Sequence, residues 1–302
     1  MSERGIPRRW EVLAVLLITL LAATLRLYRL RELPPGLHFD EGFKGVTARS
    51  LLEGAPPRIF FESDLGEEPL AIYLVAAALG LVGQEPWVVR LPSALVGALT
   101  VPLAWWLGRE LFGGRRARSG MPDGTSGASR ADSHDRLASQ LIGLGTALIL
   151  ALLYWHLSFS RIGMEPILVP FFATLAFAAL AWGLNSGRWL AFALAGVAVG
   201  GGLYTYKAGY FVPILALLFV IYAGVVERGF FRGHGQGLLL AGAAALVVAA
   251  PIGLFFVTHP ENFFQRPTSV ALTGKDASGE PWLALSGNVS RVLGMFFAQG
   301  DA

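Results

Sequence analysis

The sequence predicts an all-α polytopic membrane protein. Of its 302 residues, 54% are hydrophobic and only 15% are charged, whereas a soluble domain carries nearer a quarter charged residues. The apolar residues also occur in long runs instead of at the spacing of a half-buried strand or helix. A basic excess of 24 Lys and Arg over 21 acids would suit nucleic acid, but the arginines lie in loops between apolar runs. That placement indicates membrane orientation, and we expect no nucleic-acid partner.

The N-terminal segment predicts a retained first span. Arg4, Arg8 and Arg9 precede it and place the N-terminus in the cytoplasm. Residues Trp10 to Leu30 are long enough to cross a bilayer, and no small-residue cleavage site follows them, so the run is not a signal peptide. Cysteine is absent, which excludes disulfides and thiolate metal sites.

An acidic pair, Asp40 and Glu41, follows the first span after the turn at Pro34 to Gly36. Two adjacent carboxylates are not needed to make a helix span. Because ionisable groups at a membrane are usually functional, we expect the pair to belong to a functional site. The alternative is that the two acids lie in a solvated loop and have no such role. After the pair, Phe43 to Glu53 predicts a helix on the membrane surface.

The next apolar run, Leu70 to Val82, predicts a partial or re-entrant helix, because about a dozen residues are too few to cross. If this run does not cross, the Arg-rich loop at residues 113–136 is cytoplasmic and obeys the positive-inside rule. The composition of that loop, rich in Gly, Ser, Arg and Asp, predicts disorder.

The remaining apolar runs bring the prediction to about seven full spans plus the partial one. After Trp10 to Leu30 they are Val88 to Leu107, Leu137 to His156, Pro166 to Leu184, Trp189 to Tyr204, Phe211 to Val226 and Gly237 to Val257. We therefore expect a transmembrane module at residues 1–257, with residues 258–302 as the start of an external segment of a truncated chain.

Several charged side chains gather on the predicted outer face with the acidic pair. They are Glu68, Arg90, Arg161, Glu165 and Lys207, beside Tyr206. A carboxylate near an acceptor hydroxyl can act as a general base. Arg and Lys can hold a phosphate. Hard oxygen ligands suit Mg²⁺ or Mn²⁺, so a divalent cation is a candidate cofactor, with Glu41 and Glu165 as its candidate ligands.

Four of these residues also have a purely structural interpretation. Arg90 and Arg161 could anchor helix ends, Lys207 could belong to an interfacial belt, and Glu165 before Pro166 could favour a helix N-terminus. His38 has no second histidine nearby and is expected to be a loop residue.

The order of these features resembles the membrane glycosyltransferases of the type C fold. The acidic pair is followed by a helix ending in Leu-Leu-Glu-Gly, then Glu-Pro-Leu-Ala-Ile-Tyr-Leu and Val-Arg-Leu-Pro-Ser-Ala-Leu. A Ser-Arg turn and Tyr-x-Tyr-Lys-Ala-Gly-Tyr come next. The nearest group is glycosyltransferase family 39-like, which includes the protein O-mannosyltransferases and the aminoarabinose lipid A transferases.

The resemblance implies sugar transfer from a polyprenyl-phosphate donor to a lipid, glycan or protein hydroxyl outside the cell membrane, with inversion. Asp40 matches the catalytic base and Glu41 its neighbour, while Arg90 and Arg161 match recurring arginines. Where the aminoarabinose transferases carry Lys before the Pro of the partial run, this chain has Glu68, which shifts phosphate binding to Arg90, Arg161 or Lys207. Glu68, Glu165 and Tyr206 remain candidate substrate or metal contacts.

The alternatives are a transporter, a lipid-binding scaffold without catalysis, or an inactive truncated product. A transporter should show repeats or charged residues in mid-span. Here the spans are nearly free of charge and the acids lie at their ends, which favours chemistry on a lipid head group.

Overall fold

The computed structural model describes residues 5–62, 66–113, 126–263, 287 and 289–290. The chain divides into two compact units. Unit 1 comprises Met1–Ile59 and Glu68–Ile252, and unit 2 comprises Phe60–Glu67 and Gly253–Ala302.

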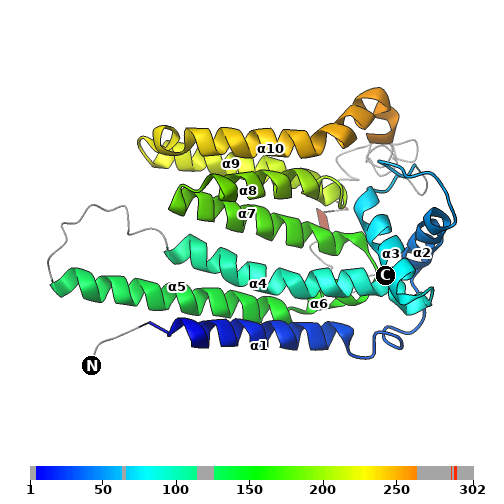
Figure 1. Ribbon diagram of the computed structural model, residues 1–302, viewed down its shortest axis with the longest axis horizontal. Helices are drawn as coiled ribbons and strands as arrows, with labels where there is room; N and C mark the ends of the chain where they lie inside the picture. The colour runs from blue at the N-terminus through cyan, green and yellow to red at the C-terminus, as the bar shows by residue number, and fades with distance from the viewer. Residues whose placement is uncertain (1–4, 63–65, 114–125, 264–286, 288, 291–302) are drawn as a thin grey trace. The chain divides into compact units, whose positions relative to one another are not determined.

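The described residues are almost entirely helical (Figure 1). The α-helices are α1 (Arg8–Leu27), α2 (Phe39–Leu52), α3 (Pro69–Val82), α4 (Leu91–Gly113), α5 (Ser126–Leu152), α6 (Tyr154–Arg161), α7 (Leu168–Ser186), α8 (Trp189–Gly202), α9 (Phe211–Val226) and α10 (Phe230–Thr258). Short 3-10 turns lead into three of them: η1 (Pro86–Arg90), η2 (Glu165–Ile167) and η3 (Lys207–Tyr210).

Six of the described helical segments are long and apolar enough to cross a membrane. They are Arg8–Leu27, Pro86–Gly113, Asp135–Leu152, Glu165–Ser186, Lys207–Val226 and Phe230–Thr258. Together they confirm the predicted all-α polytopic membrane protein. The run predicted as a further full span at Trp189 forms a helix of only 14 residues, because the chain leaves the helix after Gly202. As predicted, α3 is also a short apolar helix.

Helix α4 lies at the centre of unit 1, packed against α1, α5 and α7 (Figure 1). Small residues allow this close approach. A Cβ atom added to Gly108 would lie 3.1 Å from the Cα of Gly143 on α5, so neither glycine leaves room for a side chain.

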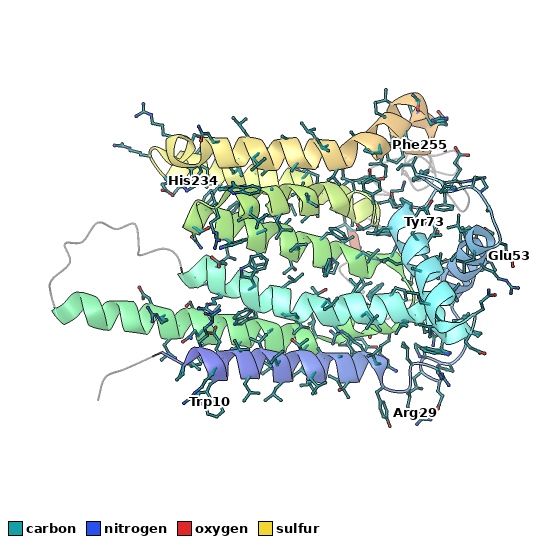
Figure 2. All side chains as sticks on the ribbon, in the orientation of Figure 1. Trp10, Arg29, Glu53, Tyr73, His234 and Phe255 are labelled. Atoms are coloured by element: carbon teal, nitrogen blue, oxygen red, sulfur yellow. The ribbon has the colours of Figure 1, made fainter. Side chains whose placement is uncertain are left out.

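Helices α2 and α3 lie together at one end of the long helices of unit 1, at an angle to them (Figure 1). We call this the α2 end, and the end that carries Trp10 the opposite end. Figure 2 shows Trp10 and Arg29 at these two ends of the α1 segment.

The predicted surface helix begins earlier than expected. It starts at Phe39, not Phe43, so Asp40 and Glu41 lie in its first turn. The cause is a capping arrangement: the His38 side chain accepts a hydrogen bond from the Asp40 amide, and the Glu41 side chain accepts one from the His38 amide. These bonds provide acceptors for backbone amides that have no hydrogen-bond partner within the helix at its N-terminus.

The two expected loop regions are described only in part. Residues 114–125 of the expected cytoplasmic loop lie outside the described residues, and α5 begins at Ser126 within the expected range. Within unit 2, Phe61 and Glu67 form an antiparallel bridge, and the Asn262 amide donates to Glu62. Residues 264–286, most of the expected external segment, lie outside the described residues as well.

Candidate functional site

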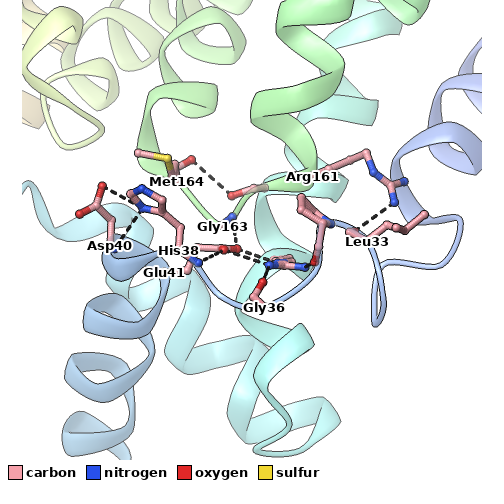
Figure 3. Close-up of polar contacts among 11 residues, drawn as sticks. Leu33, Gly36, His38, Asp40, Glu41, Arg161, Gly163 and Met164 are labelled. Atoms are coloured by element: carbon pink, nitrogen blue, oxygen red, sulfur yellow. Dashed lines mark hydrogen bonds and ion pairs between the residues drawn. The ribbon is translucent and has the colours of Figure 1, made fainter. Parts of the chain in front are cut away.

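Glu41 is the centre of the hydrogen-bond network at the α2 end (Figure 3). Its carboxylate accepts from Arg90 Nε at 2.7 Å and from Arg90 Nη2 at 3.0 Å, a bidentate ion pair. The amides of Gly163, at 2.8 Å, and His38, at 2.7 Å, complete the set. The residue is 1% exposed. Glu41 therefore joins three segments of the chain and has its oxygens occupied by protein donors.

Electrostatics keeps Glu41 ionised. Burial by itself would raise the pKa of Glu41. The hydrogen bonds from Arg90, Gly163 and His38, with the charge of Arg90, outweigh burial and hold the pKa below its ordinary value of 4.5. A carboxylate held this way suits a structural anion better than a base that must take up a proton.

Arg90, predicted to bind the donor phosphate, is 2% exposed and directs its donors to protein acceptors. Besides Glu41, its Nη1 donates to the carbonyl of Pro34 at 2.7 Å, and its Nη2 donates to the carbonyl of Gly36. Arg90 thus fixes the turn that leads into α2. These contacts favour a structural role over contact with a phosphate.

Asp40 differs from the other carboxylates of the predicted site. Its side chain is 32% exposed, and its ion-pair partner among the described residues is His38, with Nδ1 3.5 Å from the carboxylate. Figure 3 shows Asp40 and His38 beside one another at the start of α2. Of the predicted site carboxylates, Asp40 is the one that no Lys or Arg neutralises in the described part of the chain.

Glu165 forms an ion pair with Lys44, at 2.7 Å, and both side chains are buried. Lys44 lies four residues after Asp40 on α2, so the two share a helix face. The sequence analysis did not include Lys44 in the site. The available signal was its spacing from Asp40, which becomes meaningful once Asp40 is known to be helical.

Glu68 and Lys207 form a second partly buried cluster with Tyr210. The Tyr210 hydroxyl donates to Glu68 at 2.7 Å, and Lys207 Nζ lies 3.4 Å from the same oxygen. Tyr206 is half-buried and immediately precedes η3, the turn that carries both Lys207 and Tyr210. Glu68 is therefore neutralised by a lysine, which explains how an acid is accommodated before Pro69.

Arg161 is the last residue of α6, and its guanidinium donates to backbone carbonyls at the end of α1. Nη1 donates to Leu25 at 2.6 Å and to Arg26 at 3.2 Å, while Nη2 donates to Tyr28 at 2.8 Å and Leu33 at 3.1 Å. The cation thus satisfies the open carbonyls at a helix C-terminus. Figure 3 shows its side chain directed to Leu33 and away from Asp40.

Arg161 also lines a groove of about 700 Å³ between α1 and α6, which we call the α1–α6 groove. Its walls include Leu25, Tyr28, Leu33, Tyr154 and Leu157. Four carbonyl contacts and no carboxylate leave the positive charge of Arg161 uncancelled by an acid of the described chain. The groove therefore combines apolar walls with a cation.

Arg26, near the end of α1, is a buried cation that the sequence analysis did not include in the site. It is 0% exposed and donates to Ala151 at 3.2 Å and Leu150 at 3.4 Å, carbonyls where α5 ends. Its Nη2 lies 2.9 Å from His156 Nδ1, and its Nε donates to Ser160 at 3.2 Å. Arg26 thus caps α5 and contacts α6, while Arg161, the last residue of α6, caps α1.

The surroundings of Glu41 and Glu165, the two candidate metal ligands, do not favour a metal ion. In the described part of the chain no group of three or more His, Asp or Glu side chains could hold an ion. Glu41 holds Arg90 and Glu165 holds Lys44, so an ion at either carboxylate would have to displace a buried cation.

The comparisons with known proteins support the fold. No protein-family model matches the chain, and no curated protein sequence matches it. Among solved structures it is similar to the S. cerevisiae protein O-mannosyltransferase Pmt1-Pmt2 complex bound to the sugar donor, with a TM-score of 0.56 at 20% identity. The match covers 87% of this chain and 35% of the yeast chain. The likeness shows a fold shared with a type C membrane glycosyltransferase.

Proposed function

We propose that this chain is a membrane glycosyltransferase that moves a sugar from a polyprenyl-phosphate donor to an acceptor hydroxyl, with Asp40 as the general base. The observation that carries the proposal is the contrast between Asp40 and its neighbours. Glu41, Glu68 and Glu165 each pair with a protein cation, whereas Asp40 is partly exposed and its ion-pair partner among the described residues is His38. The fold shared with a mannosyltransferase supports the proposal that the chain is a glycosyltransferase.

The proposed reaction is a single displacement. The acceptor O–H gives its proton to Asp40 while its oxygen forms a bond to the anomeric carbon on the face opposite the phosphate. The bond from that carbon to the phosphate oxygen breaks, and polyprenyl phosphate leaves with the electron pair. Because the leaving group is a stable anion, no general acid is required. The configuration at the anomeric carbon inverts.

We assign the donor phosphate to Arg161 and the prenyl chain to the α1–α6 groove. The groove supplies apolar surface for a lipid, and Arg161 supplies a cation without a carboxylate partner in the described chain. Its Nε–H is not used by any hydrogen bond to the described residues, which leaves a donor for a phosphate oxygen. Lys207 is the second candidate, and Arg90 is assigned to holding the loop before α2.

The test uses the full chain in phospholipid nanodiscs with a radiolabelled polyprenyl-phosphate sugar. We expect label to pass from the donor to a new product and NMR of that product to show the inverted anomer. Retention of configuration would overturn single displacement by a base. Arg49→Gln is the matched control. If Arg161→Gln hydrolyses or transfers the sugar at the same rate as this control, the assignment of the donor phosphate to Arg161 is overturned.

We further propose that the α2 end faces outward, with a cytoplasmic N-terminus. Because the chain has no cysteine, single cysteines can report orientation directly. We expect Leu37→Cys at the α2 end to react with an impermeant maleimide added outside intact cells, and Ser186→Cys at the opposite end to remain protected. The reverse labelling pattern would place the Asp40 site in the cytoplasm.

A further inference from the structure

A second pocket lies at the α2 end, and the proposed reaction has not used it. It has a volume of about 480 Å³, within the range of ligand sites in proteins. Its lining, which defines what we call the α3 pocket, includes Pro57, Arg58, Leu70, Tyr73 and Tyr204. Figure 2 shows Tyr73 on α3 at the same end of unit 1 as Arg29, and thus at the end that carries α2. None of its lining residues belongs to the α1–α6 groove.

The hydroxyls of the two tyrosines of the α3 pocket both have hydrogen-bond partners in the protein. Tyr73 Oη accepts from the Arg58 amide at 2.7 Å and donates to the Arg58 carbonyl at 2.9 Å. Tyr204 Oη donates to the Val248 carbonyl at 2.7 Å. A peptide or glycan entering the pocket would leave its own polar groups without partners, which is costly. The lining therefore favours an apolar chain.

Arg58 adds a charge to this apolar lining. Its backbone is held by Tyr73, while its exposed guanidinium makes no hydrogen bond or ion pair with the described residues. An exposed cation beside an apolar pocket complements an amphiphile with an anionic head group.

The α3 pocket is connected to Asp40 through packed residues. Lys44, four residues after Asp40, pairs with Glu165, and η2 continues from Glu165 to Ile167. Ile167 packs with Ala71 and Leu70 of α3, and Leu70 lines the pocket. The pocket and the start of α2 therefore belong to the same packed region at the α2 end.

We infer that the α3 pocket binds the acceptor, and that the acceptor is an anionic lipid bearing a free hydroxyl. This inference rests on the proposed function, in which the α1–α6 groove holds the donor. The reaction then transfers the sugar from one lipid to another: the acceptor oxygen gains the bond to the anomeric carbon, and polyprenyl phosphate leaves. The donor chain lies in the α1–α6 groove with its phosphate at Arg161, and the acceptor chain lies in the α3 pocket with its negative charge at Arg58.

The first test measures occupancy without activity. The full chain is placed in phosphatidylcholine nanodiscs that contain phosphatidylglycerol with a photoreactive acyl chain, and crosslinked peptides are mapped by mass spectrometry. We expect crosslinks at Pro57 to Ile59 and at Tyr73, reduced about tenfold in Arg58→Gln, since a charge-assisted contact is lost. Arg49→Gln, which removes another exposed arginine of the same end, should keep the wild-type signal.

Photoreactive phosphatidylcholine separates an anionic site from general lipid contact. Equal labelling by the two lipids, or equal labelling of wild type and Arg58→Gln, would overturn the inference. So would crosslinking that is confined to the α1–α6 groove.

The second test follows the destination of the sugar. We expect radiolabel from the polyprenyl donor to enter the lipid fraction, with the KM for the acceptor raised about tenfold in Arg58→Gln and the KM for the donor unchanged. Label in protein or in a water-soluble glycan would overturn the inference and leave the proposed function standing. No transfer by wild type would overturn the proposed function and the acceptor role together, while the phosphatidylglycerol crosslinks would remain.

Discussion

Two buried carboxylates, Glu41 at the α2 end and Glu11 at the opposite end, are each 1% exposed but are held by different kinds of partner. Glu11 accepts hydrogen bonds from the side chains of Trp105, Arg109 and Gln140, at 3.2, 3.0 and 2.8 Å. Glu41 accepts from Arg90 and from two backbone amides. Glu11 therefore links helices that their apolar faces already position, whereas Glu41 defines the course of loops.

The arginines that pair with these two carboxylates differ in their exposure to solvent. The side chain of Arg109 is 40% exposed, while that of Arg90 is 3% exposed. Water can solvate Arg109 if its partner is removed, but it cannot reach Arg90 without opening the site. The α2 end therefore has a fully buried ion pair beside the partly exposed Asp40, whereas Glu11 at the opposite end pairs with a partly exposed arginine.

The largest expected effect is on catalysis by Asp40. We expect Asp40→Asn to lower turnover by about 10²–10⁴-fold, the usual worth of a general base, because the substitution keeps size but removes the basic oxygen. Donor affinity and thermal stability should stay close to wild type, since Asp40 is partly exposed and pairs only with His38 among the described residues. Turnover and donor binding are measured in nanodiscs. Near wild-type turnover would show that Asp40 is not the base.

The next effect compares the two buried carboxylates directly. Glu41→Gln leaves Arg90 buried without a charged partner, and we expect it to lower the free energy of unfolding by about 3–5 kcal/mol. Glu11→Gln should lower it by about 1–2 kcal/mol, because it weakens hydrogen bonds while Arg109 remains solvated. Thermal unfolding in detergent measures both.

A double substitution provides the control for Glu41. Replacing Glu41 and Arg90 together by Gln and Leu removes the unpaired charge, so it should recover part of the stability without recovering activity. Equal destabilisation by Glu41→Gln and Glu11→Gln would remove the distinction between the two ends.

A smaller effect tests the packing that holds α6 at the α2 end. A Cβ atom on Gly97 of α4 would lie 2.7 Å from Ser160 Cβ and 3.2 Å from Arg26 Nε. We expect Gly97→Ala to lower the free energy of unfolding by about 1–3 kcal/mol through overpacking. Gly145→Ala on α5 is the matched control, because a Cβ there meets nothing within 4 Å. Equal stability of the two variants would show that α6 moves freely against α4.

The sequence predicted most of the membrane helices, although not the short helix at Trp189 or the start of α2, and it did not predict the site contacts. Long apolar runs predict membrane helices because burial in lipid depends on composition and length alone. The acidic pair was also recognisable. The different roles of Asp40 and Glu41 could not be predicted, because the partners of Glu41 are far away in sequence. Arg90 is 49 residues from Glu41 along the chain, and Gly163 is 122 residues from it.

The predicted phosphate ligands show the same limit. Arg90, Arg161 and Lys207 were grouped as cations on one face, but each has a particular set of acceptors that depends on tertiary structure. Arg161 caps a helix whose end, at Leu27, falls before the end of its apolar run. Loop courses and side-chain partners have no period in the sequence, so no pattern predicts them.

The smallest expected effect is the pH dependence of the Glu41 contacts. The pKa of Glu41 is held below its ordinary value of 4.5, so its contribution to stability is fully present above that value and is lost as the pH falls through the lower, folded-state pKa. Protonation removes one negative oxygen, which weakens the hydrogen bond that the Gly163 amide donates.

Amide hydrogen exchange can follow this loss at single residues. We expect the protection factor of the Gly163 amide to fall as the pH is lowered below about 4.5, since the acceptor is then titrated. The Ile6 amide at the opposite end is the internal control, because it donates to the neutral side-chain oxygen of Gln140 at 2.8 Å. If both amides lose protection together, acid opens unit 1 as a whole. If Gly163 alone loses it, the buried ion pair at the α2 end is the acid-sensitive element, and activity should decline over the same pH range.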